Sequence, residues 1–248
     1  MTGLAASLIL VTTLITSFIS GIFGMAGGLI LMAVLVSLVS IAMAMVIHGS
    51  IQMVANGYRA YLLRTYIRWS IAGYFAIGAA LGVCVLLCVS WSPDKRTLYL
   101  LLGLTPLLVW VPRHYLHLDI VRPGQAIFAG CMVQGLNTLA GVAGPLLDLF
   151  FVRTDLARQD IVATKSITQA ISHAVKTGFW GLPILHALGW QALPPVWLLA
   201  LALPLCLLGT RLGKTVLMRM SESGFRKAMK WLVTAIGGVL LLRAAGMY

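Results

Sequence analysis

The chain has 248 residues, of which 60% are hydrophobic and 10% are charged, and its mean hydropathy is +0.97. This composition excludes an ordinary soluble domain and predicts an all-α polytopic membrane protein surrounded by a lipid bilayer. A formal net charge of +12 also occurs in nucleic-acid-binding proteins. Here the basic residues lie mostly between apolar segments, so membrane topology explains them and we expect no nucleic-acid partner.

Hydropathy predicts five helical segments in the first half of the chain. They are 4–22, 29–47, 49–63, 70–89 and 97–111. The first charged residue is Arg59, so the opening segment lacks the basic flank of a cleaved signal peptide. We therefore expect it to be retained as a membrane span.

Five further segments follow a charged connector. They are 123–139, 144–152, 161–180, 192–210 and 225–242. Segment 144–152 provides only about 13 Å of helix, whereas the hydrocarbon core is about 30 Å thick. We therefore expect residues 123–153 to form a re-entrant hairpin with a glycine-rich tip at 135–145, buried in protein or lining a cavity.

The two halves of the sequence resemble each other. Residues 21–28 (GIFGMAGG) correspond to 135–141 (GLNTLAG), and residues 48–52 (HGSIQ) correspond to 164–168 (TKSIT). Weak internal symmetry with glycine-interrupted segments is typical of secondary transporters, whose binding site lies between the repeats. We predict one transporter domain, 1–248, built from repeat 1–118 and repeat 119–248.

An odd number of segments per repeat would invert the second repeat relative to the first, and the charges test this parity. Alternate connectors place twelve basic residues on one side and only Lys95, Arg96 and Arg243 on the other. The positive-inside rule then makes the first side cytoplasmic and puts both termini on the opposite side. The twelve are Arg64, Arg68, Arg113, Arg122, Arg153, Arg158, Arg211, Lys214, Arg219, Arg226, Lys227 and Lys230.

Polar side chains recur at helical spacing in each half. The first stripe is His48, Gln52, Asn56 and Arg59, and the second is Lys165, Gln169, Ser172 and Lys176. Ionisable residues within spans usually face a bundle interior or a wet cavity, because exposure to hydrocarbon costs roughly 2.5 to 3.5 kcal/mol each. We expect the two stripes to attract an anion, with Lys165 as its main charge partner. Alternatively, Arg59 and Lys176 extend to the membrane interface.

The glycines of the two hairpins and three titratable side chains have two interpretations each. Gly24, Gly27, Gly28, Gly141 and Gly144 either let backbone amides approach an anion or allow close helix packing. Asp148 is the carboxylate within a hydrophobic segment, and it would relay a proton, pair with a basic stripe residue or make a structural hydrogen bond. His48 and His173 are further candidates for proton coupling, or satisfied buried histidines.

The sequence contains no His-Glu-x-x-His, Gly-x-Ser-x-Gly or phosphate-binding Walker motif. The four cysteines, Cys84, Cys88, Cys131 and Cys206, lie in apolar runs without the spacing of a zinc site. We expect them to be small buried hydrophobic side chains. We therefore predict neither an enzyme nor a metal or cofactor site.

The sequence resembles the sulfite exporter TauE/SafE family, also known as the toluene-sulfonate uptake permease family. The resemblance is carried by GMAGGLIL at 24–31, by GVAGP at 141–145 and by the polar helix after each, and it spans nearly the whole chain. It implies a multi-pass secondary transporter of the bacterial inner membrane for sulfur-containing anions, with two homologous halves that form the site; the charge distribution above then makes both termini periplasmic. The positions that match repeat motifs of the family are Gly27, Gly28, Gly141, Gly144, Ser50, Gln52, Lys165, Ser166 and Gln169.

We thus predict a secondary active transporter that moves sulfite or an organosulfonate, with protons as the candidate coupling ion and a homo-oligomer as a candidate assembly. Another small anion, such as a carboxylate, and a non-transporting membrane scaffold are the alternatives. The predicted substrate-binding residues are Lys165, Ser166, Gln169, Lys176, Ser50, Gln52, Arg59, Gly27, Gly28, Gly141 and Gly144.

Overall fold

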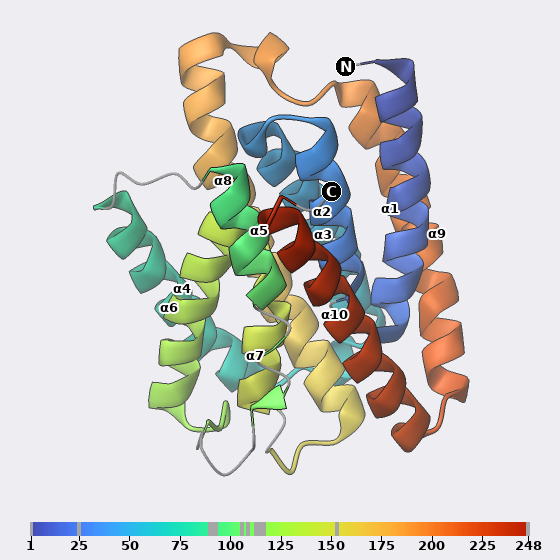
Figure 1. Ribbon diagram of the computed structural model, residues 1–248. Helices are drawn as coiled ribbons and strands as arrows, with labels where there is room; N and C mark the ends of the chain where they lie inside the picture. Colours follow the sequence, from blue (N-terminus) through green and yellow to red (C-terminus); the bar gives the residue numbers. More distant parts are fainter. Residues whose placement is uncertain are drawn as a thin grey trace.

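The computed structural model describes residues 2–23, 26–88, 94–104, 107, 110–111, 118–151 and 154–246. Within these ranges the secondary structure is entirely helical (Figure 1), so the predicted all-α fold is confirmed. The first half contains α1 (Gly3–Phe23), α2 (Ala26–Leu38), α3 (Ile41–Leu62), η1 (Arg64–Tyr66), α4 (Trp69–Leu87) and α5 (Lys95–Leu104). The second half contains α6 (Pro123–Ala140), α7 (Gly144–Phe151), α8 (Arg158–Leu188), η3 (Trp190–Ala192), α9 (Val196–Arg219) and α10 (Glu222–Ala244).

Helices α1, α4 and α9 are both long and apolar enough to cross a membrane. Each presents large apolar side chains on its outer face, such as Val11 and Ile15 on α1 and Ile77 and Leu81 on α4, as lipid contact requires. Helices α3 and α8 have 22 and 31 residues, about 33 and 46 Å of helix. They are long enough to span, and their lower hydropathy reflects the polar stripes. The protein is a multi-pass membrane protein.

Helices from opposite halves pair with each other. α1 packs against α9, α4 against α6, α3 against α8 and α5 against α10. In Figure 1 the α1–α9 pair and the α4–α6 pair form two edges of the molecule. Glycines allow these contacts: a Cβ on Gly21 would lie 2.8 Å from Gly213 Cα, and one on Gly130 would lie 2.1 Å from Phe75 O. Close approach through small residues is the usual way in which helices associate in membranes.

Both halves contain a broken helical hairpin. α6 ends at Gly141, whose φ of 83° is left-handed, and its N–H bonds to Asn137 O. α7 then has only eight residues, as expected for segment 144–152. In the first half α1 ends at Phe23 and the 13-residue α2 begins at Ala26. Gly24, Arg113, Arg153 and the predicted segment ends at 89 and 152 lie outside the described residues.

Several predicted helix boundaries were wrong; α5 ends at Leu104 rather than at 111, and α9 begins at Val196 rather than at 192. The sequence placed a break at His48, but α2 ends at Leu38 and α3 begins at Ile41. Hydropathy stays high across this junction and gives no sign of it. The start of α3 is instead marked by a single residue: the Ser40 side chain accepts a hydrogen bond from Met43 N at 3.4 Å and caps the helix. Likewise, α8 continues through Pro183 to Leu188, and α9 continues past Thr210 to Arg219. Pro183 in α8 and the basic residues of α9 lower the hydropathy of the sequence at these positions, but both helices continue past them.

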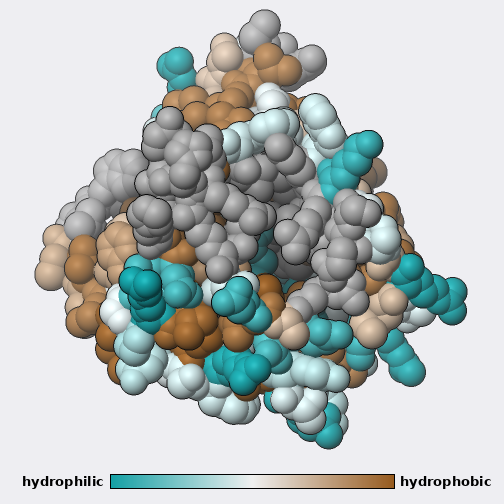
Figure 2. All heavy atoms as spheres, turned by 90° about the horizontal axis from the view of Figure 1, so that it is seen from below, coloured by the Kyte–Doolittle hydropathy of each residue, from teal (hydrophilic) through white to brown (hydrophobic). Residues whose placement is uncertain are grey.

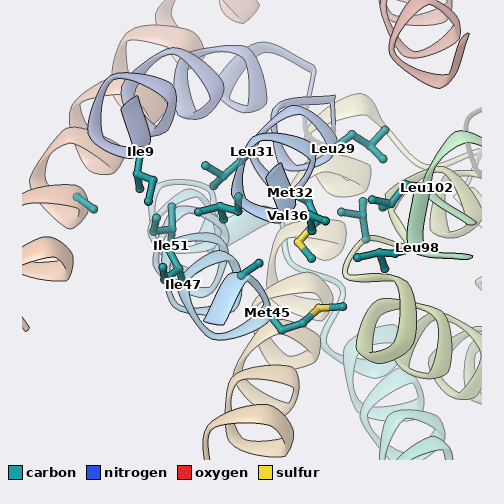
Figure 3. Close-up of a cluster of buried hydrophobic side chains, with 14 of the residues drawn as sticks. Ile9, Leu29, Leu31, Met32, Val36, Met45, Ile47, Ile51, Leu98 and Leu102 are labelled. Carbon is teal, nitrogen blue, oxygen red and sulfur yellow. The ribbon is translucent and has the colours of Figure 1, made fainter. Parts of the chain in front are cut away.

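Two apolar clusters flank the polar interior. The larger joins α2 to α1, α3 and α5 through side chains that include Leu31, Met32, Ile47 and Leu98 (Figure 3). The smaller packs α7 against α4 and α6 and includes Phe75, Phe150 and Phe151. Cys206 is buried as expected, but Cys84, on the outer face of the apolar helix α4, and Cys88, which directly follows this helix, are exposed. Cys131 is partly buried, so the prediction of four buried cysteines is confirmed for Cys206 and wrong for Cys84 and Cys88.

Basic side chains gather at one end of the helix bundle. Arg68 precedes α4, Arg122 precedes α6 and Arg219 ends α9, and all three are exposed. These helix ends lie at the bottom of Figure 1. Figure 2 views that end directly and shows hydrophilic residues spread over it between apolar ones. We refer to it below as the basic end.

Candidate functional site

Helices α3 and α8 bury polar side chains at their contact, because the two stripes face the interior rather than lipid. The whole stripe of α3 is buried, and Lys176 at the far end of the α8 stripe is 0% exposed. Arg59 is 3% exposed and donates from Nη1 to Asn56 Oδ1 at 3.2 Å. The alternative that Arg59 and Lys176 extend to the membrane interface is therefore wrong.

A hydrogen-bond chain centred on Lys176 joins the two halves. Lys176 Nζ lies 2.7 Å from His48 Nδ1 and 2.8 Å from Gly141 O. Since a lysine ammonium only donates, His48 accepts at Nδ1 and carries its proton on Nε2. That nitrogen lies 2.9 Å from Gly28 O, to which it donates. The chain thus connects α2 to the break between α6 and α7.

A small cavity lies beside this chain. It leaves about 20 Å³ for the centre of a water molecule, room for one or a few waters. Its walls come from α2, α3, α6, α7, α8 and the α6–α7 break. The lining residues are Gly28, His48, Gln52, Val133, Asn137, Val142, Ala143, Gly144, Gln169, Ser172 and His173. We call it the central pocket.

The polar wall of the central pocket offers several hydrogen-bond donors and one unsatisfied buried acceptor, Asn137 Oδ1. Gln52 Nε2 is buried and makes no hydrogen bond to another described residue. Ser172 Oγ accepts from Asn137 Nδ2 at 2.8 Å, which leaves the serine O–H available as a donor. His173 Nδ1 lies 3.4 Å from the same amide nitrogen, and its ring meets that of His48 edge to face at 5.4 Å. The arrangement suits a small acceptor-rich ligand.

A basic side chain, Lys176, lies next to the central pocket. Lys176 bonds to an imidazole and a carbonyl, both neutral, and none of the carboxylates that the structure describes lies within ion-pair distance of it. It contacts the pocket wall through His48, and Gly141 directly precedes the lining residues Val142 and Ala143. A buried cation among neutral groups favours an anion nearby.

Lys165, expected to be the main charge partner of the anion, forms an ion pair with Asp148. The side chains are 12% and 7% exposed, respectively, and neither residue lines the central pocket. This pairing was one of the alternatives for Asp148. The pocket residues Gln169 and Gly144 lie four positions away from Lys165 and Asp148 on the same helices, so the pair lies about one helical turn from the pocket.

The glycines of the hairpins divide into two groups. A Cβ on Gly27 would lie 1.9 Å from Thr16 O, so this glycine serves the close packing of α2 on α1. A Cβ on Gly28 would lie 3.5 Å from Gln52 Nε2 and would enter the central pocket. Gly144 lines the pocket, and Gly141 supplies the carbonyl that binds Lys176.

Besides Lys165, Arg59 and Gly27, the predicted site residues Ser50 and Ser166 do not line the central pocket. Ser50 is two positions after His48, about 200° around α3. Ser166 is buried and donates to Val162 O at 2.7 Å within α8. The sequence reasoning also missed Asn137, which lines the pocket and bonds to α8. An amide at the tip of a glycine-rich hairpin was the signal that could have identified it.

Comparisons with known proteins agree with this architecture. The family model described as Sulfite exporter TauE/SafE matches residues 8–240. No curated protein and no solved structure matches the chain. Among the described residues, no three His, Cys, Asp or Glu side chains are grouped so that they could hold a metal ion. The match covers nearly the whole sequence, including both broken hairpins and both polar helices, and the chain therefore belongs to the sulfite exporter TauE/SafE family.

Proposed function

We propose that the protein is a secondary active transporter that binds a small sulfur oxyanion, sulfite or a short organosulfonate, in the central pocket. The family is one of membrane transporters named for sulfite export. The observation that carries the proposal is Lys176, a fully buried lysine that bonds only to neutral groups among the described residues, beside a pocket with the donors Gln52 and Ser172.

Electrostatics support an anion in this place. An isolated charge in a low-dielectric interior is costly, and a bound anion would reduce that cost. At about 6 Å and an effective dielectric constant of about 20, two opposite charges attract by about 3 kcal/mol. Gln52 and Ser172 would donate to the oxygen atoms of the anion, since hydrogen bonds to ionised acceptors are the strong ones.

The helix pairing supports two inverted repeats, 1–118 and 119–248. Exchanging the halves converts the α1–α9 pair into the α6–α4 pair and leaves the α3–α8 and α5–α10 pairs unchanged. α1 and α6, the first helix of each half, run in opposite directions in Figure 1. The central pocket takes residues from both halves. Movement of the halves about this site would provide alternating access and widen the pocket for its ligand.

The sidedness follows from the charges. The basic end carries most of the exposed arginines of the connectors, and the positive-inside rule assigns it to the cytoplasm. We propose the inner membrane of a bacterial cell as the location, with both termini on the periplasmic side.

Flux into proteoliposomes that contain only this protein tests the proposal. We expect saturable uptake of radiolabelled sulfite that unlabelled methanesulfonate suppresses and acetate does not. Suppression by acetate alone would instead favour a carboxylate transporter. Absence of flux for both anion classes, in protein shown to be folded by circular dichroism, would favour a membrane scaffold and contradict the proposal.

A further inference from the structure

The ion pair between Asp148 and Lys165 has no part in the binding site described above, yet it occupies a distinctive position. Along α8, Lys165 lies between Asp160 at the basic end and Gln169 in the central pocket. Asp160 is already paired with Arg68, whose Nε lies 3.0 Å from Asp160 Oδ2. The Asp148–Lys165 pair, which is largely shielded from solvent, therefore lies between the pocket and the basic end along α8.

Asp148 has an oxygen atom ready for a proton. Its Oδ1 accepts from Lys165 Nζ, whereas its Oδ2 is buried and has no hydrogen-bond partner among the described residues. Buried carboxylate oxygens normally accept hydrogen bonds. A proton on Oδ2 forms one O–H bond there and breaks no existing hydrogen bond.

The two histidines of the pocket are less suited to take up that proton. His48 is bonded at both ring nitrogens, to Lys176 and to Gly28 O. His173 Nδ1 contacts the amide nitrogen of Asn137. A second proton on His48 would displace the Lys176 amine from Nδ1, and one on His173 would displace the Asn137 amide from Nδ1. Of the three candidates for proton coupling, Asp148 is therefore the one with an available acceptor atom.

Among the described residues, few other charges lie around Asp148. Lys165 faces it from α8, and Arg59 on α3 is near enough to Lys165 for their charges to interact. Helices α4 and α6, which form the wall behind α7, contain no Asp, Glu, Lys, Arg or His. Neutralising Asp148 would therefore leave the two cations, Lys165 and Arg59, without this carboxylate.

We propose that Asp148 takes up the proton that accompanies the anion, and that its protonation releases Lys165 to act as a second cation for the anion in the central pocket. The inference rests on the proposed function. Lys165 lies about one turn from the pocket residue Gln169, so its charge reaches the bound anion. By linkage, an anion in the pocket then favours the proton on Asp148, and the proton favours the anion to the same degree. The coupled species are one proton and one anion.

Binding of methanesulfonate to the purified protein in detergent, measured by calorimetry, tests the inference. This anion keeps one charge across the pH range, so its own titration does not contribute. We expect the parent to bind at least about tenfold more tightly at about pH 6 than at about pH 8, and to take up about one proton per anion. Proton uptake is read from titrations in two buffers with different ionisation enthalpies.

The decisive variant is Asp148→Asn, which keeps the shape and removes the titrating group. It should bind with the low-pH affinity of the parent at both pH values and take up no proton. Asp160→Asn is the matched control, since it alters an ion-paired carboxylate on α8 outside the pocket, and it should keep the slope of the parent. The double variant Asp148→Asn/Lys165→Met should bind weakly at both pH values, because the second cation is gone.

The outcomes separate the two proposals. Absence of sulfonate binding by the parent would overturn the proposed function and this inference with it. Binding by the parent together with an unchanged pH slope and proton uptake in Asp148→Asn would overturn the inference alone. If Asp148→Asn does not fold, the double variant decides: proton uptake equal to that of the parent would overturn the inference.

Discussion

Two lysines of α8, eleven residues apart, lie in the interior, Lys176 fully and Lys165 largely buried, and they differ in what surrounds the amine. Lys165 is neutralised within the protein by Asp148. Lys176 bonds to His48 and Gly141 O, which carry no charge to offset its own. An ion pair is neutral overall and needs no further counter-charge. A buried cation without a counter-charge is stabilised when an anion binds next to it. We therefore assign attraction of the anion to Lys176. Lys165 attracts the anion only when Asp148 is protonated.

The largest expected effect comes from breaking the complete pair. Lys165→Met leaves the Asp148 carboxylate buried without its counter-charge, which at about pH 8, where this carboxyl is ionised in the parent, costs up to about 3 to 5 kcal/mol of stability. Thermal unfolding in detergent should show a lower transition temperature, and the double variant Asp148→Asn/Lys165→Met should recover most of it. Equal destabilisation of the single and double variants would show that packing, not charge, sets the cost.

The same substitution at the other lysine should affect binding more than stability. Lys176→Met removes the attraction of about 3 kcal/mol expected at about 6 Å, so sulfite should bind roughly 100-fold more weakly. The buried unpaired charge is lost together with two hydrogen bonds of about 1 kcal/mol each, so the unfolding temperature should change less than in Lys165→Met.

Calorimetry on the two lysine variants, with Lys176→Arg as the charge-conserving control, measures this contrast. Lys176→Arg should retain much more of the affinity than Lys176→Met. Binding of sulfite by Lys176→Met with the parent affinity would contradict the assignment of Lys176 as the cation of the pocket.

The difference between the two lysines also shows what the sequence could predict. Helical spacing identified both polar stripes, because a buried face repeats every three or four residues whatever lies opposite. It could not show that Asp148, on another helix, pairs with Lys165, or that Lys176 reaches a carbonyl at the break after α6. These contacts depend on where separate elements meet in space, and the sequence therefore favoured Lys165.

The boundaries failed for a related reason. Hydropathy averaged over a stretch of sequence indicates whether a segment lies in lipid or in the protein interior. The ends of a helix depend on single side chains, such as the Ser40 cap of α3. Glycine spacing predicted both broken hairpins, yet it did not distinguish Gly27, which packs against Thr16 O, from Gly28, which opens the pocket. Two adjacent glycines look alike in a sequence until the neighbouring helix is placed.

A smaller effect is expected at the donor side of the pocket. Gln52→Leu removes the buried amide nitrogen that has no hydrogen-bond partner in the described structure. The affinity for sulfite should fall by about 1.5 kcal/mol, roughly tenfold, without loss of stability, because an unsatisfied polar group leaves the interior. Titration of sulfite together with thermal unfolding measures both quantities. Reduced stability with unchanged affinity would show that Gln52 supports the fold rather than the ligand.

The smallest expected effect separates two serines of α8 that are six positions apart. Ser172 lines the pocket and has a hydroxyl proton to offer, whereas Ser166 donates to Val162 O within its own helix. Ser172→Ala should weaken sulfite binding by about 1 kcal/mol, roughly fivefold, while Ser166→Ala should stay within about twofold of the parent. Ser50→Ala, on the other side of α3, is a second control and should behave like Ser166→Ala. Equal losses in all three variants would mean that the pocket does not define the site, and that the ligand follows the repeat motifs of the two helices instead.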